Sequence, residues 1–210
     1  MTKHTTEEPH ATYSKSRVEA LSDGIFAIVL TLLVLELKVP QLPESQVHSS
    51  SALAHMLIEA FPKFASWVVS YLVLAIIWQN HHRLLDVFRH VTKPLFWANA
   101  LLLMGASFIP FPTALWGEYP NNPLAVSLYG VTMIVVTLFF LIIRMVAHRD
   151  PGLLKPEYDF ATFKRGTAQV TIFGCGVYLL GAIVSWWSPL AATLVYIAIS
   201  IHFFLPGTGR

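Results

Sequence analysis

Polar and ionisable side chains precede a long apolar stretch near the start of the sequence. Arg17, Ser22 and Asp23 come first, and residues 24–35 then carry Thr31 as their only polar side chain. A helix that crosses a membrane needs roughly 20 mostly apolar residues, and this stretch with its flanks supplies them. An ionisable residue at the edge of such a helix costs on the order of 2.5–3.5 kcal/mol unless it is paired or hydrated. Asp23 is therefore a candidate functional residue.

Four residues share one side of this predicted helix. Ile28, Leu32 and Leu35 follow spacings of four and three residues, and Thr31 lies between them. This side therefore presents large apolar groups and a single hydroxyl. In an isolated apolar helix, such a side most often packs against lipid or a neighbouring helix. Glu36 follows at the far end, either as a group that concentrates cations or as an ordinary helix-end charge.

Two adjacent histidines, His81 and His82, raise the question of a metal site. Successive residues of a helix point about 100° apart, and no carboxylate or cysteine lies at a supporting spacing. The motifs HExxH and GxSxG do not occur in the sequence, and Cys175 is its only cysteine. We therefore expect no enzyme activity, no metal centre and no resident cofactor.

The composition is typical of a membrane protein. Hydrophobic residues make up 55% and charged residues 12% of the 210 residues, with a mean hydropathy of +0.58. A soluble domain is typically about 25% charged. The formal charge of +2 is small and the basic residues form no continuous stripe, which argues against nucleic-acid binding. We expect the lipid bilayer to surround the chain and nucleic acid not to be a partner.

Apolar runs predict an all-α membrane protein with six transmembrane helices. Residues 1–14 are polar and form a predicted tail, and residues 15–210 form one transmembrane domain. Pro110 and Pro112 are expected to end the third span. Basic residues concentrate on one side of the membrane, so the positive-inside rule places both termini in the cytoplasm. The predicted spans are residues 17–37, 63–82, 94–111, 124–144, 167–187 and 189–205.

Several ordered motifs resemble one family of channels. Residues 17–24 read Arg-x-x-x-Leu-Ser-Asp-Gly, followed by Ala-Ile at 27–28 and Thr-Leu-Leu at 31–33. Further matches are Trp-x-x-His-His-Arg at 78–83, Asn99, and Ser-Phe-Ile-Pro-Phe-Pro-Thr at 107–113. Together they resemble the endosomal and lysosomal potassium channel family, of the transmembrane protein 175 type, in its short bacterial branch. That family has Phe where this sequence has Leu21, and the hydroxyl and the acid of the motif are kept.

The resemblance implies a potassium-permeable cation channel that conducts passively. In that family four copies of a six-helix unit surround a pore lined by the first helix, so a homotetramer is expected, in a bacterial plasma membrane. Monovalent cations are the expected partners, with K⁺ as the permeant ion and no other cofactor. Ile28, Leu32 and Leu35 would form apolar gate rings, and Thr31 would supply oxygens for potassium preference. Glu36 would lie at the outer mouth.

The resemblance also implies a hydrogen-bonded network at the foot of the first helix. In that family basic, hydroxyl and acidic residues at this foot bond to a Trp and a His of neighbouring helices. Such a network would give a buried Asp23 the partners that it needs. In this sequence its members would be Arg17, Ser22, Asp23, Trp78 and His81.

Two other classes of function stay open at this point. A proton-coupled secondary transporter would use Asp23 and His81 as a relay, since intramembrane acids and histidines mark such paths. Saturable uptake driven by a pH gradient would distinguish it from a channel. A purely structural assembly protein is also compatible with the composition, but it gives no role to the polar foot of the first helix.

Overall fold

The structure is a computed structural model in which residues 12–204 are described. The predicted tail of residues 1–14 lies mostly outside this range, and so does the last residue of the predicted span 189–205. Besides helices, the described chain contains a short antiparallel ladder, in which β1 (Thr12–Tyr13) pairs with β2 (Val91–Thr92). The ladder joins the residues just before the first helix to those just before the helix that begins at Lys93.

Helices make up most of the described chain. Short 3₁₀ segments lie at Leu33–Glu36, Glu44–Gln46 and Pro151–Leu153, and a π-helical segment lies at Val170–Gly176. The α-helices are α1 (Lys15–Leu32), α2 (Ser50–Glu59), α3 (Phe61–Asp86), α4 (Lys93–Phe108), α5 (Pro110–Glu118), α6 (Pro123–Arg149), α7 (Phe160–Gln169), α8 (Val177–Val184) and α9 (Pro189–Phe204).

Five helical segments of the described chain are long and apolar enough to cross a membrane, by length and composition. A further apolar helix, Pro189–Ile201, is shorter. The prediction of a helical membrane protein is therefore confirmed, while the count of six spans stays a prediction. The five segments are Lys15–Glu36, Phe61–Asp86, Lys93–Glu118, Pro123–Arg149 and Phe160–Val184.

Two spans differ most from their predicted limits, each by seven residues at one end. Pro110 and Pro112 do not end the apolar segment, because they occupy the first turn of α5, where a missing N–H costs nothing. The segment therefore continues to Glu118 instead of ending at residue 111. The fifth segment begins at Phe160, seven residues before the predicted 167, because the Asp159 side chain accepts a hydrogen bond from the Thr162 N–H at 2.9 Å and caps α7.

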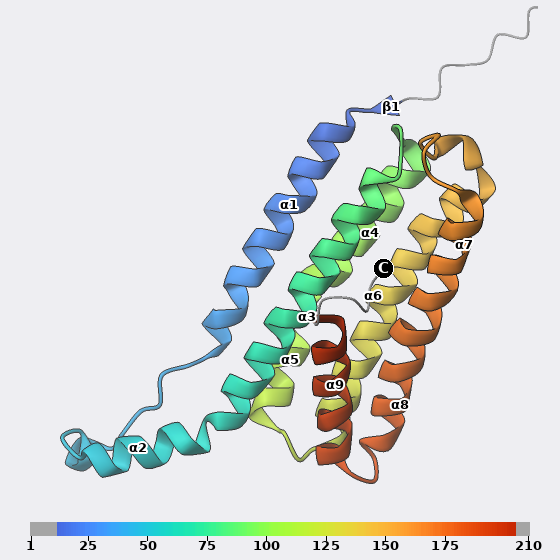
Figure 1. The fold of residues 1–210 in the computed structure, drawn as a ribbon. Coiled ribbons are helices and arrows are strands. Elements are labelled where there is room, and N and C mark those ends of the chain that lie inside the picture. Colours follow the sequence, from blue (N-terminus) through green and yellow to red (C-terminus); the bar gives the residue numbers. More distant parts are fainter. Residues whose placement is uncertain (1–11, 205–210) are drawn as a thin grey trace, which may run out of the picture.

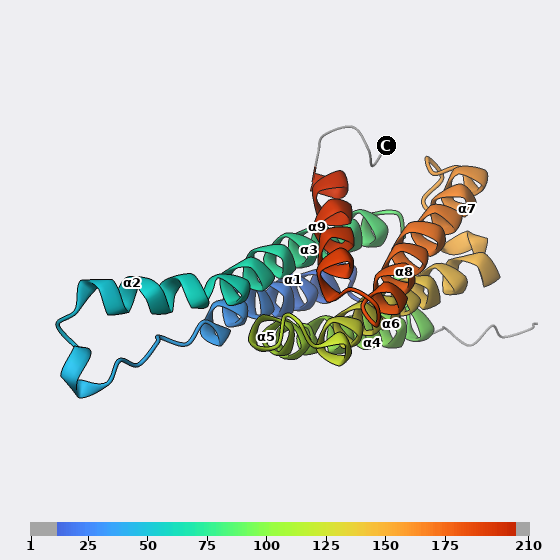
Figure 2. The ribbon, with the colours of Figure 1, turned by 90° about the horizontal axis from the view of Figure 1, so that it is seen from below.

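The helices form a bundle around α6, and α1 lies at its edge (Figure 1). In an apolar stretch of 18 residues within the α6 segment 56% of the residues are buried, compared with 28% in the corresponding stretch of the segment that contains α1. α1 packs on α3 and α4, and α9 packs on α3 and α8. α2 extends away from the bundle (Figure 2), and none of its residues is buried. One side of α1 is thus left uncovered within a single chain.

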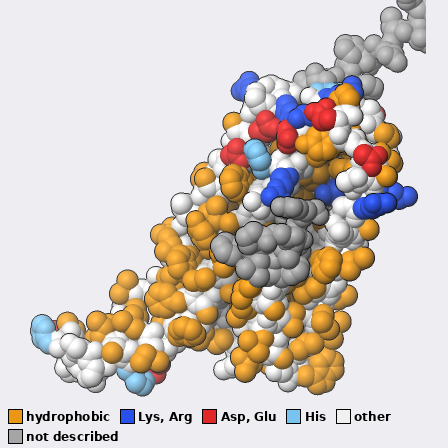
Figure 3. Space-filling view, viewed as in Figure 1, with side chains coloured by type: hydrophobic (Ala, Val, Ile, Leu, Met, Phe, Trp, Pro, Cys, Tyr) orange, Lys and Arg blue, Asp and Glu red, His pale blue; other side chains and the backbone are white. Residues whose placement is uncertain are grey.

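Charged side chains gather at one end of the face shown in Figure 3. They lie over the end where α1 and α4 begin and α6 ends, and hydrophobic side chains cover most of the face beyond them. Because charges are costly in the hydrocarbon core of a bilayer, we place this end at the membrane surface and the apolar part in lipid.

Candidate functional site

α1 has one face buried against the bundle and one face exposed. The buried face carries residues at helical spacings of three and four, which bring them to one side. Val29 is 3% exposed and Leu33 is fully buried, both packed in the core. The buried residues of α1 and of the 3₁₀ turn that follows it are Val18, Ser22, Phe26, Val29 and Leu33.

The opposite face carries the four residues that the sequence groups together. Ile28 is 59% exposed, Leu32 43% and Leu35 68%, and Thr31 is exposed between them. Large apolar side chains in a continuous stripe require lipid or another protein surface to cover them. The structure thus places these residues where a neighbouring copy or a pore axis can lie, and their role in a pore stays a prediction.

The Thr31 hydroxyl bonds back to its own helix. Its Oγ1 lies 2.8 Å from the Ile28 carbonyl oxygen and 3.1 Å from that of Ala27, and it donates its one proton to them. Because the proton points into the helix, the oxygen lone pairs point outward on the exposed face. This geometry suits an oxygen that contacts a cation.

A buried chain of hydrogen bonds joins α1, α4 and α3. Ser22 Oγ donates to the Val18 carbonyl at 2.8 Å, so it accepts from Asn99 Nδ2 at 3.0 Å. Asn99 Oδ1 is then the acceptor for His81 Nε2 at 2.6 Å. Ser22, Asn99 and His81 are each at most 1% exposed. Because Ser22 has one proton and donates it to Val18, it can only accept from Asn99. The amide oxygen of Asn99 must then face His81.

The second ring nitrogen of His81 has no hydrogen-bond partner among the described residues. Nδ1 is buried, and the Phe26 ring lies with its centroid 5.2 Å from that of the imidazole. A ring with its proton on Nε2 satisfies Asn99 and leaves only a lone pair at Nδ1. The geometry therefore favours the Nε2–H tautomer.

Asp23 lies on the exposed side, contrary to the prediction that it is buried in the network. Trp78 Nε1 donates to its Oδ1 at 2.9 Å, and both side chains are exposed. Adjacent helix residues point about 100° apart, so when Ser22 faces the bundle Asp23 turns outward. The predicted network is therefore two separate sets of bonds. Arg17 has no hydrogen bond or ion pair to either set among residues 12–204.

Asn99 is the member that the predicted network lacks. It connects Ser22 to His81, which do not bond each other directly. Its signal in the sequence is an amide within the otherwise apolar residues of α4, at a position that belongs to the family motif. A buried amide must find partners, but the sequence does not say which.

The start of α1 is tied to the end of α3 at the charged end of the bundle. Lys15 Nζ donates to the Phe88 carbonyl at 2.8 Å and lies 3.5 Å from Glu19 Oε1. Lys155 Nζ donates to Asp86 Oδ1 at 2.7 Å, and this bond raises the pKa of Lys155. Of these contacts, the bond from Lys15 to the Phe88 carbonyl joins the foot of α1 to the residues that follow α3.

Glu36 borders a cavity of about 310 Å³ at the other end of α1. Lys38, Lys63 and Glu118 also line it, and Lys63 Nζ lies 2.6 Å from Glu118 Oε2. Glu36 forms no ion pair with a described residue. Its two readings, cation-concentrating group and ordinary helix-end charge, therefore both stay open.

His81 and His82 face different surroundings. His81 is buried beside Phe26, whereas His82 is exposed next to Trp78, with ring centroids 6.3 Å apart. Within the described part of the chain, no three His, Cys, Asp or Glu side chains gather in a way that could hold a metal ion.

Comparison with known proteins gives the same family as the sequence motifs. The family model described as "Endosomal/lysosomal potassium channel TMEM175" matches residues 17–110. A potassium channel of Chamaesiphon minutus is 34% identical over 192 residues, which cover 90% of this chain and 93% of that protein. An endosomal/lysosomal proton channel TMEM175 of Danio rerio is 25% identical over 95% of this chain, which spans 38% of that longer protein.

A solved structure supports the same assignment. The crystal structure of a lysosomal potassium-selective channel TMEM175 homolog from Chamaesiphon minutus superposes with a TM-score of 0.78 at 33% identity, over 90% of this chain and 96% of that one. The family is one of ion channels in membranes and not a family of enzymes. The likeness extends over nearly the whole length of both chains. This chain belongs to the endosomal/lysosomal potassium channel TMEM175 family.

Proposed function

We propose that the chain forms a potassium-permeable cation channel of the bacterial plasma membrane, in which residues 15–210 are one channel domain and α1 lines the pore. The observation that carries the proposal is the exposed stripe of α1, which combines apolar side chains with one hydroxyl. The other face of this helix is buried against the bundle. The bacterial relatives that are named potassium channels support potassium as the permeant ion.

The proposed assembly is a homotetramer of six-span subunits with cytoplasmic termini. A single chain leaves α1 at the edge of its bundle, so a pore lined by this helix needs further copies to enclose it. Basic residues concentrate at the end where α1 begins and α6 ends, which supports a cytoplasmic position for that end. Four copies of α1 would then surround a common axis.

Rings of Ile28, Leu32 and Leu35 would form the closed gate. Apolar constrictions of this kind exclude water, and an ion cannot cross them without its hydration shell. Between the rings, Thr31 would supply the side-chain oxygens. Its outward lone pairs support this role, because the hydroxyl proton is already donated to the Ile28 carbonyl.

Removing the Thr31 hydroxyl tests the selectivity part of the proposal. In Thr31→Ala we expect the permeability of potassium relative to sodium to fall toward one while the cation current persists, because no other side chain of the proposed pore changes. Reversal potentials under bi-ionic conditions measure this ratio. Thr31→Ser keeps the hydroxyl and should keep the preference. An unchanged ratio in Thr31→Ala would assign selectivity to another residue.

Passive potassium flux tests the function itself. Purified protein in liposomes should release potassium down its gradient when inside and outside pH are equal, because a channel needs no coupled ion. Potassium that leaves the liposomes must be balanced by other cations that enter. A fluorescent dye that responds to this entry follows the flux, and liposomes without protein give the background. A flux that requires a pH gradient and saturates with potassium would contradict the channel and support a proton-coupled transporter.

The geometry gives the transporter reading less support than the sequence did. Asp23 bonds to Trp78 on the exposed side, whereas His81 bonds to Asn99 inside the bundle. No hydrogen bond joins Asp23 to His81 among the described residues, so a direct relay between the two lacks a connection. The vertebrate relatives are named proton channels, and their names favour proton permeation as the second candidate activity.

A further inference from the structure

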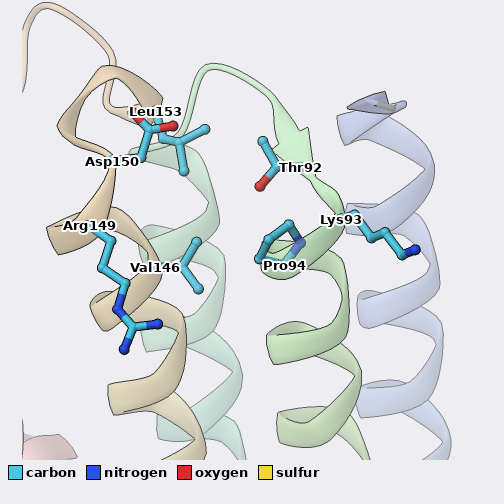
Figure 4. Close-up of a pocket in the computed structure, with 7 residues that line it drawn as sticks. All are labelled: Thr92, Lys93, Pro94, Val146, Arg149, Asp150 and Leu153. Atoms are coloured by element: carbon cyan, nitrogen blue, oxygen red, sulfur yellow. The ribbon is translucent and has the colours of Figure 1, made fainter. Parts of the chain in front are cut away.

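A cavity lies between the start of α4 and the end of α6, at the charged end of the bundle. Its volume is about 370 Å³. Figure 4 shows Thr92, the last residue of β2, and Pro94 of α4 opposite Val146 of α6. The Arg149 side chain extends along α6, and the Lys93 side chain extends from α4 toward α1. The residues that line the cavity are Thr92, Lys93, Pro94, Val146, Arg149, Asp150 and Leu153.

The charges around this cavity favour an anion. Lys93 and Arg149 are exposed, and neither forms an ion pair with a residue in the range 12–204. The one acidic group, Asp150, already accepts a hydrogen bond from the Gly152 N–H at 3.2 Å. α4 begins here without a side-chain cap and α6 ends here, so the opposite dipole ends of the two helices offset each other and the two cations supply the attraction.

The walls favour a ligand that is apolar as well as anionic. Pro94, Val146 and Leu153 contribute apolar surface beside the cations. Farther along the same helices, Trp97 is 58% exposed and Met145 48%. An aromatic ring one turn below a lysine is typical of the membrane interface, where headgroups meet acyl chains.

We propose that this cavity binds the phosphate of an anionic phospholipid, with Arg149 and Lys93 on opposite sides of the headgroup and the acyl chains along α4 and α6. Basic pockets between helices at a membrane surface commonly hold such headgroups. The proposal goes beyond channel activity and does not rest on it. With the orientation proposed above, this lipid would lie in the cytoplasmic leaflet. A lipid here contacts α4. The same helix carries Asn99, which donates a hydrogen bond to Ser22 of α1.

Native mass spectrometry of the purified protein, titrated with phosphatidylglycerol or phosphatidylcholine, tests the proposal. We expect phosphatidylglycerol to bind more tightly than phosphatidylcholine. Lys93→Gln and Arg149→Gln should each weaken the phosphatidylglycerol adduct about fivefold, from about 1 kcal/mol for each cation near a lipid surface. Val146→Phe narrows the cavity without changing charge and should also weaken it.

The matched control removes two charges of the same sign elsewhere. Lys164 and Arg165 are exposed on α7 and do not line the cavity, so Lys164→Gln/Arg165→Gln should leave the adduct within twofold of the parent. An equal loss in this control would reduce the effect to diffuse attraction and overturn the site. Equal binding of phosphatidylglycerol and phosphatidylcholine would also overturn the proposed site, because the cavity would then have no preference for an anion. Displacement of the lipid by millimolar inorganic phosphate would assign the cavity to a free anion instead.

Discussion

Ile28→Asn will raise the passive potassium flux roughly tenfold, because lowering the barrier at an apolar constriction by about 1.4 kcal/mol is sufficient for that factor. Ile28 is 59% exposed on the stripe of α1, and in the proposed tetramer four copies of it meet at the axis. An amide there binds water in the constriction and stabilises the wetted state. Flux from potassium-loaded liposomes, normalised to the amount of assembled protein, measures the effect.

The control separates a gate from a general effect of placing Asn in the membrane. Ile183 is 49% exposed on α8, far from α1 in the bundle, and Ile183→Asn makes the same chemical change. We expect Ile183→Asn to leave the flux near the parent value. An equal rise in both variants would point to leak around a destabilised bundle, and no rise in Ile28→Asn would remove this residue from the pore axis.

The exposed stripe of α1 was predictable because helix periodicity is a local property. Spacings of three and four residues place Ile28, Thr31, Leu32 and Leu35 on one side whatever surrounds the helix, and all four are exposed. The side of α1 that faces the bundle is the one whose polar residue has hydrogen-bond partners on another helix. Ser22 does so, and the adjacent Asp23 is turned outward as a consequence.

The start of α7 shows a signal that was present in the sequence but not used. Asp159 precedes Thr162 by three residues, and its carboxylate accepts from both the N–H and the hydroxyl of Thr162 at 2.9 Å. These bonds lower the pKa of Asp159. Lys164 and Arg165 lie inside α7, so basic residues do not mark its limit, and the cap decides where the helix begins.

The pairing of Asn99 was not predictable, because it depends on how three helices meet. Asn99 lies 18 positions after His81 and 77 after Ser22, and the three residues lie on different helices, so no helical spacing relates them. Each is a polar residue in an apolar helix, which predicts only that it has some partner. The motif of the family contains all three, yet sequence alone joins His81 to Asp23 as easily as to Asn99.

Asn99→Leu is expected to destabilise the bundle by roughly 2–4 kcal/mol, the cost of leaving buried polar groups without partners. His81 loses the acceptor of its Nε2–H and Ser22 loses a donor, and both side chains are almost fully buried. Unfolding in mixed detergent–denaturant micelles measures the change. Asn80 is exposed on α3 beside His81, and Asn80→Leu should stay within about 0.5 kcal/mol of the parent.

A second substitution distinguishes a broken hydrogen bond from a simple misfit of leucine. If the loss in Asn99→Leu comes from the orphaned Nε2–H of His81, replacing that donor as well removes the cost. Phe in place of His81 fits the site beside Phe26, so Asn99→Leu/His81→Phe should be more stable than Asn99→Leu alone. Additive destabilisation by the two changes would instead mean that shape, and not hydrogen bonding, holds α1, α3 and α4 together at this level.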